Sequence, residues 1–156
     1  MLDRRRFITG GAFTHKEQSG FQWPAPKKKR RSTVRVLVIE DEPLNAMCFE
    51  DALMGDNHEV TVIAGVIRQG DQLIGLGNEG DMPLDLSAFD FAVVDGKVLG
   101  DLMGWEIVPL LVAAGITCIG VSGDSNDKIV AAGAKTSFNK PFSIRLLPEA
   151  IAALSK

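Results

Sequence analysis

Long hydrophobic runs are missing from this sequence of 156 residues. A membrane-spanning helix needs roughly 18 or more consecutive apolar residues, and here Asp, Lys or Gly interrupts every apolar run after a few positions. We therefore predict a protein without membrane insertion. The composition, with 46% hydrophobic and 24% charged residues, is typical of a folded chain long enough for one domain.

Cysteine is also scarce. The two cysteines, Cys48 and Cys118, lie far apart in separate apolar segments. No Cys-x-x-Cys pair and no Cys/His ligand spacing is present, which excludes a zinc cluster and a disulfide framework. We interpret both residues as buried free thiols in a reducing cytosol and predict a cytoplasmic protein.

Positive charge is concentrated in the first 33 residues. Residues 1–33 hold nine Lys and Arg against two Asp and Glu, whereas residues 34–156 hold eight against eighteen. The first segment mixes Gly and Pro with charge and has no periodicity, so we predict a disordered basic arm over residues 1–33 and a folded domain over residues 34–156. The cations of Lys27 to Arg31 could contact nucleic acid, but the acidic domain argues against nucleic acid as a partner.

Short apolar runs alternate with helical patterns from Val34 onward. The runs predict five strands, at Val36–Ile39, Val60–Ile63, Phe91–Val94, Thr117–Val121 and Thr136–Phe138. Helical patterns follow at Leu44–Leu53, near Val66–Ile74, and at Glu106–Ala114, Asp127–Ala132 and Ile144–Leu154, the last with Ser143 as N-cap. Four of the strands are nearly continuous apolar runs, typical of parallel strands covered on both faces. We therefore predict an α/β fold with a doubly wound, five-stranded parallel sheet and helices on both faces.

Polar side chains follow these strands at the edge where the carboxyl ends meet. Glu40 and Asp41 follow the first strand, Asp95 the third, Ser122 the fourth and Lys140 the fifth. In an open parallel sheet this edge holds the functional crevice. Two carboxylates about 4 Å apart repel by ~4 kcal/mol at an effective dielectric near 20, so a divalent cation is favoured there. Oxygen ligands suit Mg²⁺ or Mn²⁺, which indicates phosphoryl transfer to Asp95, with Ser122 and Lys140 binding the phosphoryl oxygens.

Four ordered motifs carry these residues, namely Val36–Pro43, Phe91–Asp95, Val121–Gly123 and Asn139–Phe142. With them, residues 34 to 155 resemble the receiver domain of two-component response regulators. The resemblance implies a flavodoxin-like sheet in the order 2-1-3-4-5, a topology that the chemotaxis receiver also illustrates.

The resemblance also implies the roles of individual residues. Asp95 would be the phosphoacceptor, and Ser122 and Lys140 would bind the phosphoryl group. Glu40, Asp41, Asp95 and the backbone carbonyl of Lys97 would bind the metal ion. The peptide bond before Pro141 would be cis.

The function implied is that of a response regulator receiver. A sensor histidine kinase or histidine phosphotransferase would phosphorylate Asp95 in a Mg²⁺-dependent reaction, and the domain would act on an unknown downstream protein or serve as a phosphate sink. Since no effector domain follows, we expect a stand-alone receiver, a monomer or weak dimer. It would not be an enzyme beyond catalysing its own phosphorylation and dephosphorylation.

Several positions depart from the family pattern. Gly70 to Asp85 predicts an enlarged loop, and Leu99 and Gly104 predict an altered path for the loop after Asp95. Ser137 stands where the family often has an aromatic residue, while Phe138 should face the other way. These departures leave one alternative, a pseudo-receiver scaffold that takes no phosphate. A second alternative is a nucleic-acid-associated protein that uses the basic arm.

Overall fold

The computed structural model describes residues 32–155. Its elements in chain order are β1 (Arg35–Ile39), α2 (Pro43–Gly55), β2 (Glu59–Ile63), β3 (Gly65–Gln69), β4 (Gln72–Gly77), β5 (Gly80–Pro83), the 3₁₀ helix η1 (Leu86–Ala88), β6 (Phe91–Asp95), β7 (Leu99–Gly100), α3 (Gly104–Ala113), β8 (Thr117–Ser122), α4 (Asn126–Ala132), β9 (Thr136–Asn139) and α5 (Leu146–Leu154). The predicted arm lies outside the described residues up to position 31, so the arm and its boundary stay predictions.

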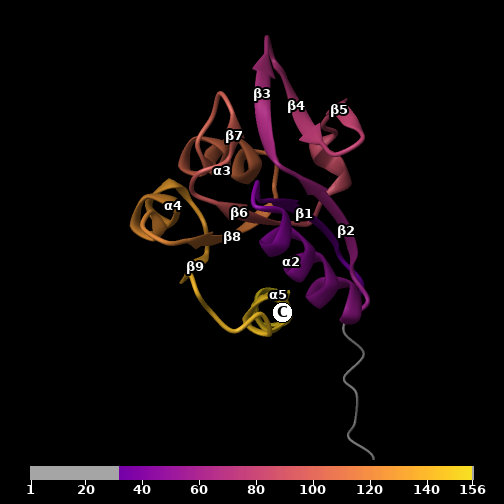
Figure 1. Cartoon of the computed structure of the whole chain (residues 1–156), viewed down its shortest axis with the longest axis vertical. Helices are drawn as coiled ribbons and strands as arrows, with labels where there is room; N and C mark the ends of the chain where they lie inside the picture. The colour runs from indigo at the N-terminus through magenta and orange to yellow at the C-terminus, as the bar shows by residue number, and fades with distance from the viewer. Residues whose placement is uncertain (1–31, 156) are drawn as a thin grey trace, which may run out of the picture. The chain divides into compact units, whose positions relative to one another are not determined.

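Five strands form a parallel sheet in the order β2-β1-β6-β8-β9 (Figure 1). This order is the predicted 2-1-3-4-5, and the doubly wound α/β fold is confirmed. In the register of the sheet, Ile39 at the end of β1 lies opposite Ile63 of β2 and Val94 of β6. The carboxyl ends of these strands therefore lie at one edge.

Helices cover the parallel sheet on both faces because alternate strand residues point in opposite directions. On one face, Val36, Val38 and Val93 pack in a core with residues of α2 and α5. On the other face, Leu37 and Val94 pack in a core with residues of α3 and α4. Burial on both faces explains why the strand sequences are almost continuously apolar.

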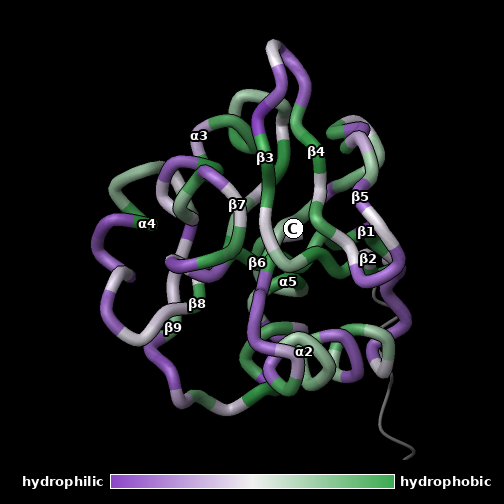
Figure 2. Tube along the Cα trace, turned by 45° about the horizontal axis from the view of Figure 1, so that its top comes forward, coloured by the Kyte–Doolittle hydropathy of each residue, from purple (hydrophilic) through white to green (hydrophobic). Residues whose placement is uncertain are grey.

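The predicted helix near Val66–Ile74 is wrong, because this segment forms β3 and β4 of a second sheet in the order β5-β4-β3-β7. The predicted loop Gly70–Asp85 likewise contains β4 and β5. Gly70 has a positive φ of 60° in the tight turn between the two strands, a conformation that glycine adopts without strain. Figure 2 shows this turn as hydrophilic. Val66 of β3 and Leu73 of β4, which lie outside the turn, are buried in the core.

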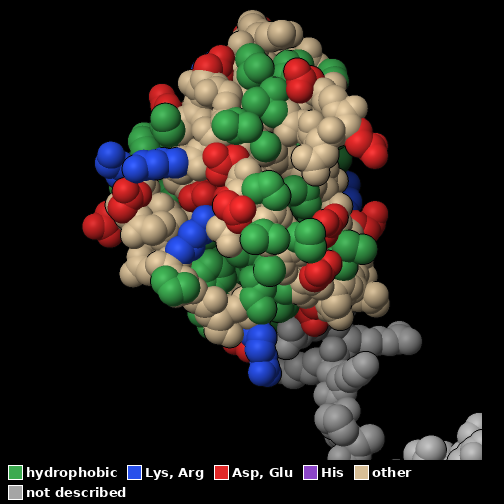
Figure 3. All heavy atoms as spheres, viewed as in Figure 1, with side chains coloured by type: hydrophobic (Ala, Val, Ile, Leu, Met, Phe, Trp, Pro, Cys, Tyr) green, Lys and Arg blue, Asp and Glu red, His purple; other side chains and the backbone are tan. Residues whose placement is uncertain are grey.

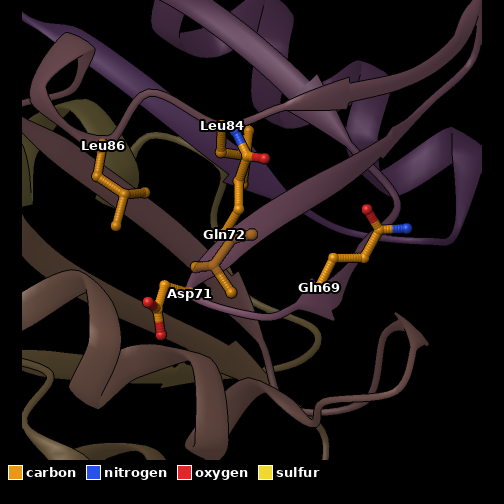
Figure 4. Close-up of a pocket in the computed structure, with 6 residues that line it drawn as sticks. Gln69, Asp71, Gln72, Leu84 and Leu86 are labelled. Carbon is orange, nitrogen blue, oxygen red and sulfur yellow. The ribbon is translucent and has the colours of Figure 1, made fainter.

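A pocket of about 390 Å³ lies beside the second sheet (Figure 4). Its lining residues come from the β3–β4 hairpin and from the segment around η1, and are Gln69, Asp71, Gln72, Leu73, Leu84 and Leu86. None of the predicted site residues lines this pocket, which therefore plays no part in the candidate site.

Ser143 is not the N-cap of the last helix, contrary to the prediction. Its carbonyl accepts a hydrogen bond from the backbone N–H of Leu146 at 3.0 Å, so Ser143 begins a turn, and α5 begins three residues later. Pro148 falls in the first turn of α5, where its missing N–H costs no helical hydrogen bond. None of the helices described here is long and apolar enough to cross a membrane.

The two cysteines differ in exposure, which corrects the prediction for one of them. Cys118 on β8 is fully buried, and burial raises the pKa of its thiol to about 12. Cys48 is exposed, because α2 packs on the sheet through Ala46, Phe49 and Leu53 and so turns Cys48 away from it. Both cysteines are free thiols.

Asp90 anchors the start of β1 and provides a test of the fold. Its carboxylate accepts hydrogen bonds from the backbone N–H of Arg35 at 2.8 Å and from the guanidinium of Arg35 at 3.0 Å. These bonds lower the pKa of Asp90. We expect Asp90→Asn to reduce the free energy of unfolding by roughly 1 kcal/mol near neutral pH, a small effect because both side chains are partly exposed.

The effect of Asp90→Asn should depend on pH. The folded state favours the ionised carboxylate, so the stabilisation is present above the unfolded pKa of about 3.9 and is lost as pH falls through the lower folded pKa. Urea denaturation of both proteins at about pH 7, pH 5 and pH 3 measures this. A difference between them that does not shrink toward about pH 3 would contradict the assignment.

Candidate functional site

The loops at the carboxyl edge of the parallel sheet bring three predicted site residues into direct contact. Glu40 follows β1, Asp95 ends β6, and Lys140 follows β9. The Nζ atom of Lys140 donates a hydrogen bond to Oε1 of Glu40 at 2.6 Å and another to Oδ2 of Asp95 at 2.9 Å. Sheet order brings Glu40 and Asp95 together, because β1 and β6 are neighbours, whereas Lys140 reaches them from β9 across the end of β8.

Three carboxylates gather around this contact. Glu40, Asp41 and Asp95 each offer one oxygen, and the three oxygens lie within 4.8 Å of one another. Glu40 and Asp95 are buried, whereas Asp41 is more exposed. Carboxylate oxygens at this spacing are the donors that a small, hard divalent cation prefers. The donor set therefore fits Mg²⁺ or Mn²⁺.

Lys97, whose backbone carbonyl is a predicted metal ligand, lies two positions after Asp95. The Lys97 ammonium forms an ion pair with Asp124 at 3.0 Å, and both side chains are exposed. This pair links the loop after β6 to the loop after β8. The ligand role of the Lys97 carbonyl stays a prediction.

Burial and neighbouring charges shift the pKa values of Glu40 and Lys140. The pKa of Glu40 is raised to about 7: burial is the largest cause, the hydrogen bond from Lys140 opposes the shift, and the neighbouring Asp95 adds to it. For Lys140, burial acts to lower the pKa, but the hydrogen bonds to Asp95 and Glu40 outweigh it and raise the pKa above its ordinary value. Lys140 is therefore held as a cation next to the Asp95 carboxylate.

Ser122 lies at the end of β8, and its side chain is almost fully buried. Its Oγ accepts hydrogen bonds from the backbone N–H groups of Asp124 at 3.3 Å and Ser125 at 3.0 Å. A methyl group placed on Gly96 would lie 2.9 Å from this Oγ, so Ser122 sits against the residue that follows Asp95. With these two hydrogen bonds accepted, the hydroxyl still has its one O–H to donate.

The segment after β9 positions Lys140. The Lys140–Pro141 peptide bond is cis, and the backbone N–H of Lys140 donates to the carbonyl of Ser122 at 3.0 Å. Phe142 packs against Phe138, with ring centroids 5.6 Å apart, and against Phe49 of α2 at 5.7 Å. Phe138 thus packs with the α2 and α5 core, away from Ser137, as expected.

The loop after Asp95 is attached to the second sheet through β7. Leu99 and Gly100 pair in parallel with Gly65 and Val66 of β3. At the other end of the loop, the N–H of Gly104 donates to the carbonyl of Gly96 at 2.8 Å. Sequence reasoning missed this attachment because the segment containing β3 was predicted to be helical.

A groove of about 610 Å³ opens beside the carboxylates, between α2 and the β4–β5 hairpin. Glu40 and Asp41 line it together with Met47 and Glu50 of α2 and Met82 of β5, among others. On the front face of the molecule in Figure 3, hydrophobic side chains are interspersed with Asp and Glu. Leu44, Met47 and Met54 are the large exposed hydrophobic residues of α2. The groove provides access to the carboxylate cluster.

Comparisons of the sequence with known proteins find no family model and no curated protein that matches. Solved structures do match. A CheY-like response regulator receiver domain protein from Methanospirillum hungatei is 20% identical, with a TM-score of 0.57, and the match covers 79% of this chain and 94% of that chain.

Two further matches carry ions in their structures. The receiver domain of a sensor histidine kinase from Pseudomonas aeruginosa, with a magnesium ion in its active-site cleft, is 17% identical with a TM-score of 0.57, covering 78% of this chain and 97% of its own. A response regulator from Burkholderia pseudomallei, with a phosphorylated aspartic acid and a calcium ion, is 18% identical with a TM-score of 0.55, covering 78% and 70%. The part of the chain that the structure describes has the fold of a response regulator receiver domain.

Proposed function

We propose that residues 34–155 are a receiver domain that accepts a phosphoryl group on Asp95. The donor would be a phosphohistidine of a sensor histidine kinase or of a histidine phosphotransferase. The observation that carries the proposal is the Lys140 ammonium placed 2.9 Å from Asp95 and 2.6 Å from Glu40, with the Asp41 carboxylate beside them. A pseudo-receiver scaffold that takes no phosphate does not need this partly buried ammonium between two carboxylates, whereas a phosphoacceptor does.

The proposed reaction exchanges one bond to phosphorus for another. A carboxylate oxygen of Asp95 attacks phosphorus, the new O–P bond forms, and the P–N bond to the donor histidine breaks. The electron pair of that bond stays on the imidazole nitrogen. The Lys140 ammonium would donate to one phosphoryl oxygen and the Ser122 hydroxyl to another, which lowers the repulsion between the incoming group and Asp95.

A divalent cation is part of the proposal. The side chains of Glu40, Asp41 and Asp95 and the carbonyl of Lys97 would hold Mg²⁺ or Mn²⁺. When bound, the cation supplies positive charge that offsets the carboxylates and the phosphoryl oxygens. The magnesium in the receiver from Pseudomonas aeruginosa supports this part of the proposal.

The output would be a change of affinity for a downstream protein, or storage of phosphate as a sink. In this proposal the domain is a phosphoacceptor and not an enzyme acting on other substrates. We place it in the cytoplasm, as a monomer or weak dimer.

Incubation with acetyl phosphate tests the function directly. With Mg²⁺ present, intact-mass spectrometry is expected to show the addition of one phosphoryl group. EDTA should abolish the addition and excess Mn²⁺ should restore it, because the carboxylate cluster needs a cation to admit another anion. No addition in the presence of Mg²⁺ would refute the phosphoacceptor, and equal addition in EDTA would refute the metal requirement.

A further inference from the structure

We infer that Asn126 is a positioning residue with two effects. It fixes the spacing between Ser122 and Lys140, and it transmits a movement of Ser122 to α4. The inference rests on the proposed function, since it concerns the response of the same site to a phosphoryl group. Asn126 is the first residue of α4 and is half-buried. Its side chain reaches the end of β8, where Ser122 lies, and the strand β9, which Lys140 follows.

The amide of Asn126 uses both of its ends. Its Nδ2 donates a hydrogen bond to the backbone carbonyl of Ser122 at 2.9 Å and another to Oδ1 of Asn139. Its Oδ1 accepts a hydrogen bond from Oγ of Ser137. One side chain thus connects the end of β8, the strand β9 and the start of α4.

The carbonyl of Ser122 is the centre of this arrangement. It accepts one hydrogen bond from Nδ2 of Asn126 and another from the backbone N–H of Lys140 at 3.0 Å. Ser122 would bind one phosphoryl oxygen and Lys140 another. The Asn126 amide therefore helps to set the spacing between the two groups that must bind the same phosphoryl group.

Close packing leaves little space for these elements to move independently. A methyl group on Gly120 of β8 would lie 2.5 Å from Oγ of Ser137 and 2.5 Å from Cγ2 of Ile129 on α4. The Oγ of Ser122 is held by the backbone N–H groups of Asp124 and Ser125, so a shift of Ser122 toward a phosphoryl oxygen would carry its backbone carbonyl along. The hydrogen bond from Asn126 then draws the start of α4 with it.

The polar contact occupies the place where an aromatic side chain would otherwise be expected. Ser137 contacts Asn126, while the neighbouring Phe138 packs on the opposite face of the sheet with Phe142. No aromatic side chain of β9 is therefore available on the α4 side. A hydrogen-bonded amide is the connection that this chain has in its place.

The test compares Asn126→Asp with Asp127→Asn in the full-length protein. Asn126→Asp keeps the size of the side chain and its acceptor for Ser137, but loses the donors to Ser122 and Asn139. Asp127→Asn makes the reverse exchange at the next, exposed position of α4. Amide ¹H–¹⁵N spectra are recorded during titration with beryllofluoride in the presence of Mg²⁺, and thermal unfolding is followed in parallel.

In the wild-type protein, beryllofluoride should shift the amides around Asp95 and Ser122, and also those of α4 and β9. In Asn126→Asp, the shifts at saturation should stay near Asp95 and Ser122. The affinity for beryllofluoride should fall about five- to tenfold, the loss expected for one partly buried hydrogen bond. Asp127→Asn should behave as the wild type does.

Each outcome has a separate meaning. A wild-type pattern in Asn126→Asp overturns the inference and leaves the proposed function intact. No response in the wild type overturns the proposed function and the inference with it. If Asn126→Asp fails to fold, Ser137→Ala takes its place. It removes one of the two contacts from Asn126 to β9 and keeps the one to Asn139, so the shifts of β9 should be reduced while those of α4 persist. Unchanged β9 shifts would overturn the inference.

Discussion

Asp95→Asn is expected to abolish phosphorylation by acetyl phosphate. An amide is neutral and poorly nucleophilic, so the atom that would attack phosphorus is lost while the size of the side chain is kept. The amide oxygen can still accept the hydrogen bond from Lys140, which lies 2.9 Å from Oδ2 of Asp95 in the wild-type protein. The fold should therefore be retained. Intact-mass spectrometry under the labelling conditions measures the loss.

The matched control is Asp101→Asn. Asp101 is the next carboxylate after Asp95 in the same loop, and it is exposed and accepts a hydrogen bond from the N–H of Arg68 at 3.2 Å. This variant should be labelled to the wild-type extent. Labelling that persists in Asp95→Asn, or that disappears only in Asp101→Asn, would place the acceptor elsewhere.

Gly104→Ala is expected to produce the largest loss of stability at the site, about 3 kcal/mol or more. The added methyl group would lie 2.0 Å from the backbone oxygen of Asp95 and 2.9 Å from Cα of Gly96. Both are backbone atoms, so no side chain can rotate away and the loop itself must move. Since the backbone that must move includes Asp95 itself, phosphorylation should be lost together with stability.

Gly123→Ala is the matched control, because it adds the same methyl group in the loop after Ser122. Nothing lies within 4 Å of that position. Its free energy of unfolding should stay within about 0.5 kcal/mol of the wild type, and labelling should be unaffected. Urea denaturation and mass spectrometry on both variants provide the comparison. Equal stability of Gly104→Ala and wild type would mean that α3 does not approach Asp95 as closely as described.

The sequence predicted the parallel sheet well and the second sheet poorly, for one physical reason. The strands of the parallel sheet are buried on both faces, so Val36–Ile39 and Phe91–Val94 are apolar at every position, a pattern that few other structures produce. The segment from Val66 to Ile74 is short and covered on one side, so its spacing fitted a helix as readily as a hairpin. Only packing of Val66 and Leu73 into the core decides for the hairpin.

The candidate site shows the same division at the level of single residues. Strand order and strand ends placed Glu40, Asp95 and Lys140 at one edge, because parallel strands all end on the same side. The role of Asn126 had no signal in the sequence, since an amide at the start of a short helix is ordinary. Its importance arises from contacts with Ser122 and Ser137, which belong to other strands.

By itself, then, the sequence determined the alternation of strands and helices and the chemical types available at the carboxyl edge, because these depend on local periodicity and on which residue follows each strand. Tertiary structure alone decided the antiparallel pairing of β3, β4 and β5, the exposure of Cys48 and the raised pKa of Glu40. Each of these depends on which residues, distant in sequence, pack against the residue in question. Burial and long-range contacts are properties of the assembled fold, and they set both the pKa of a carboxyl and the partner of an amide.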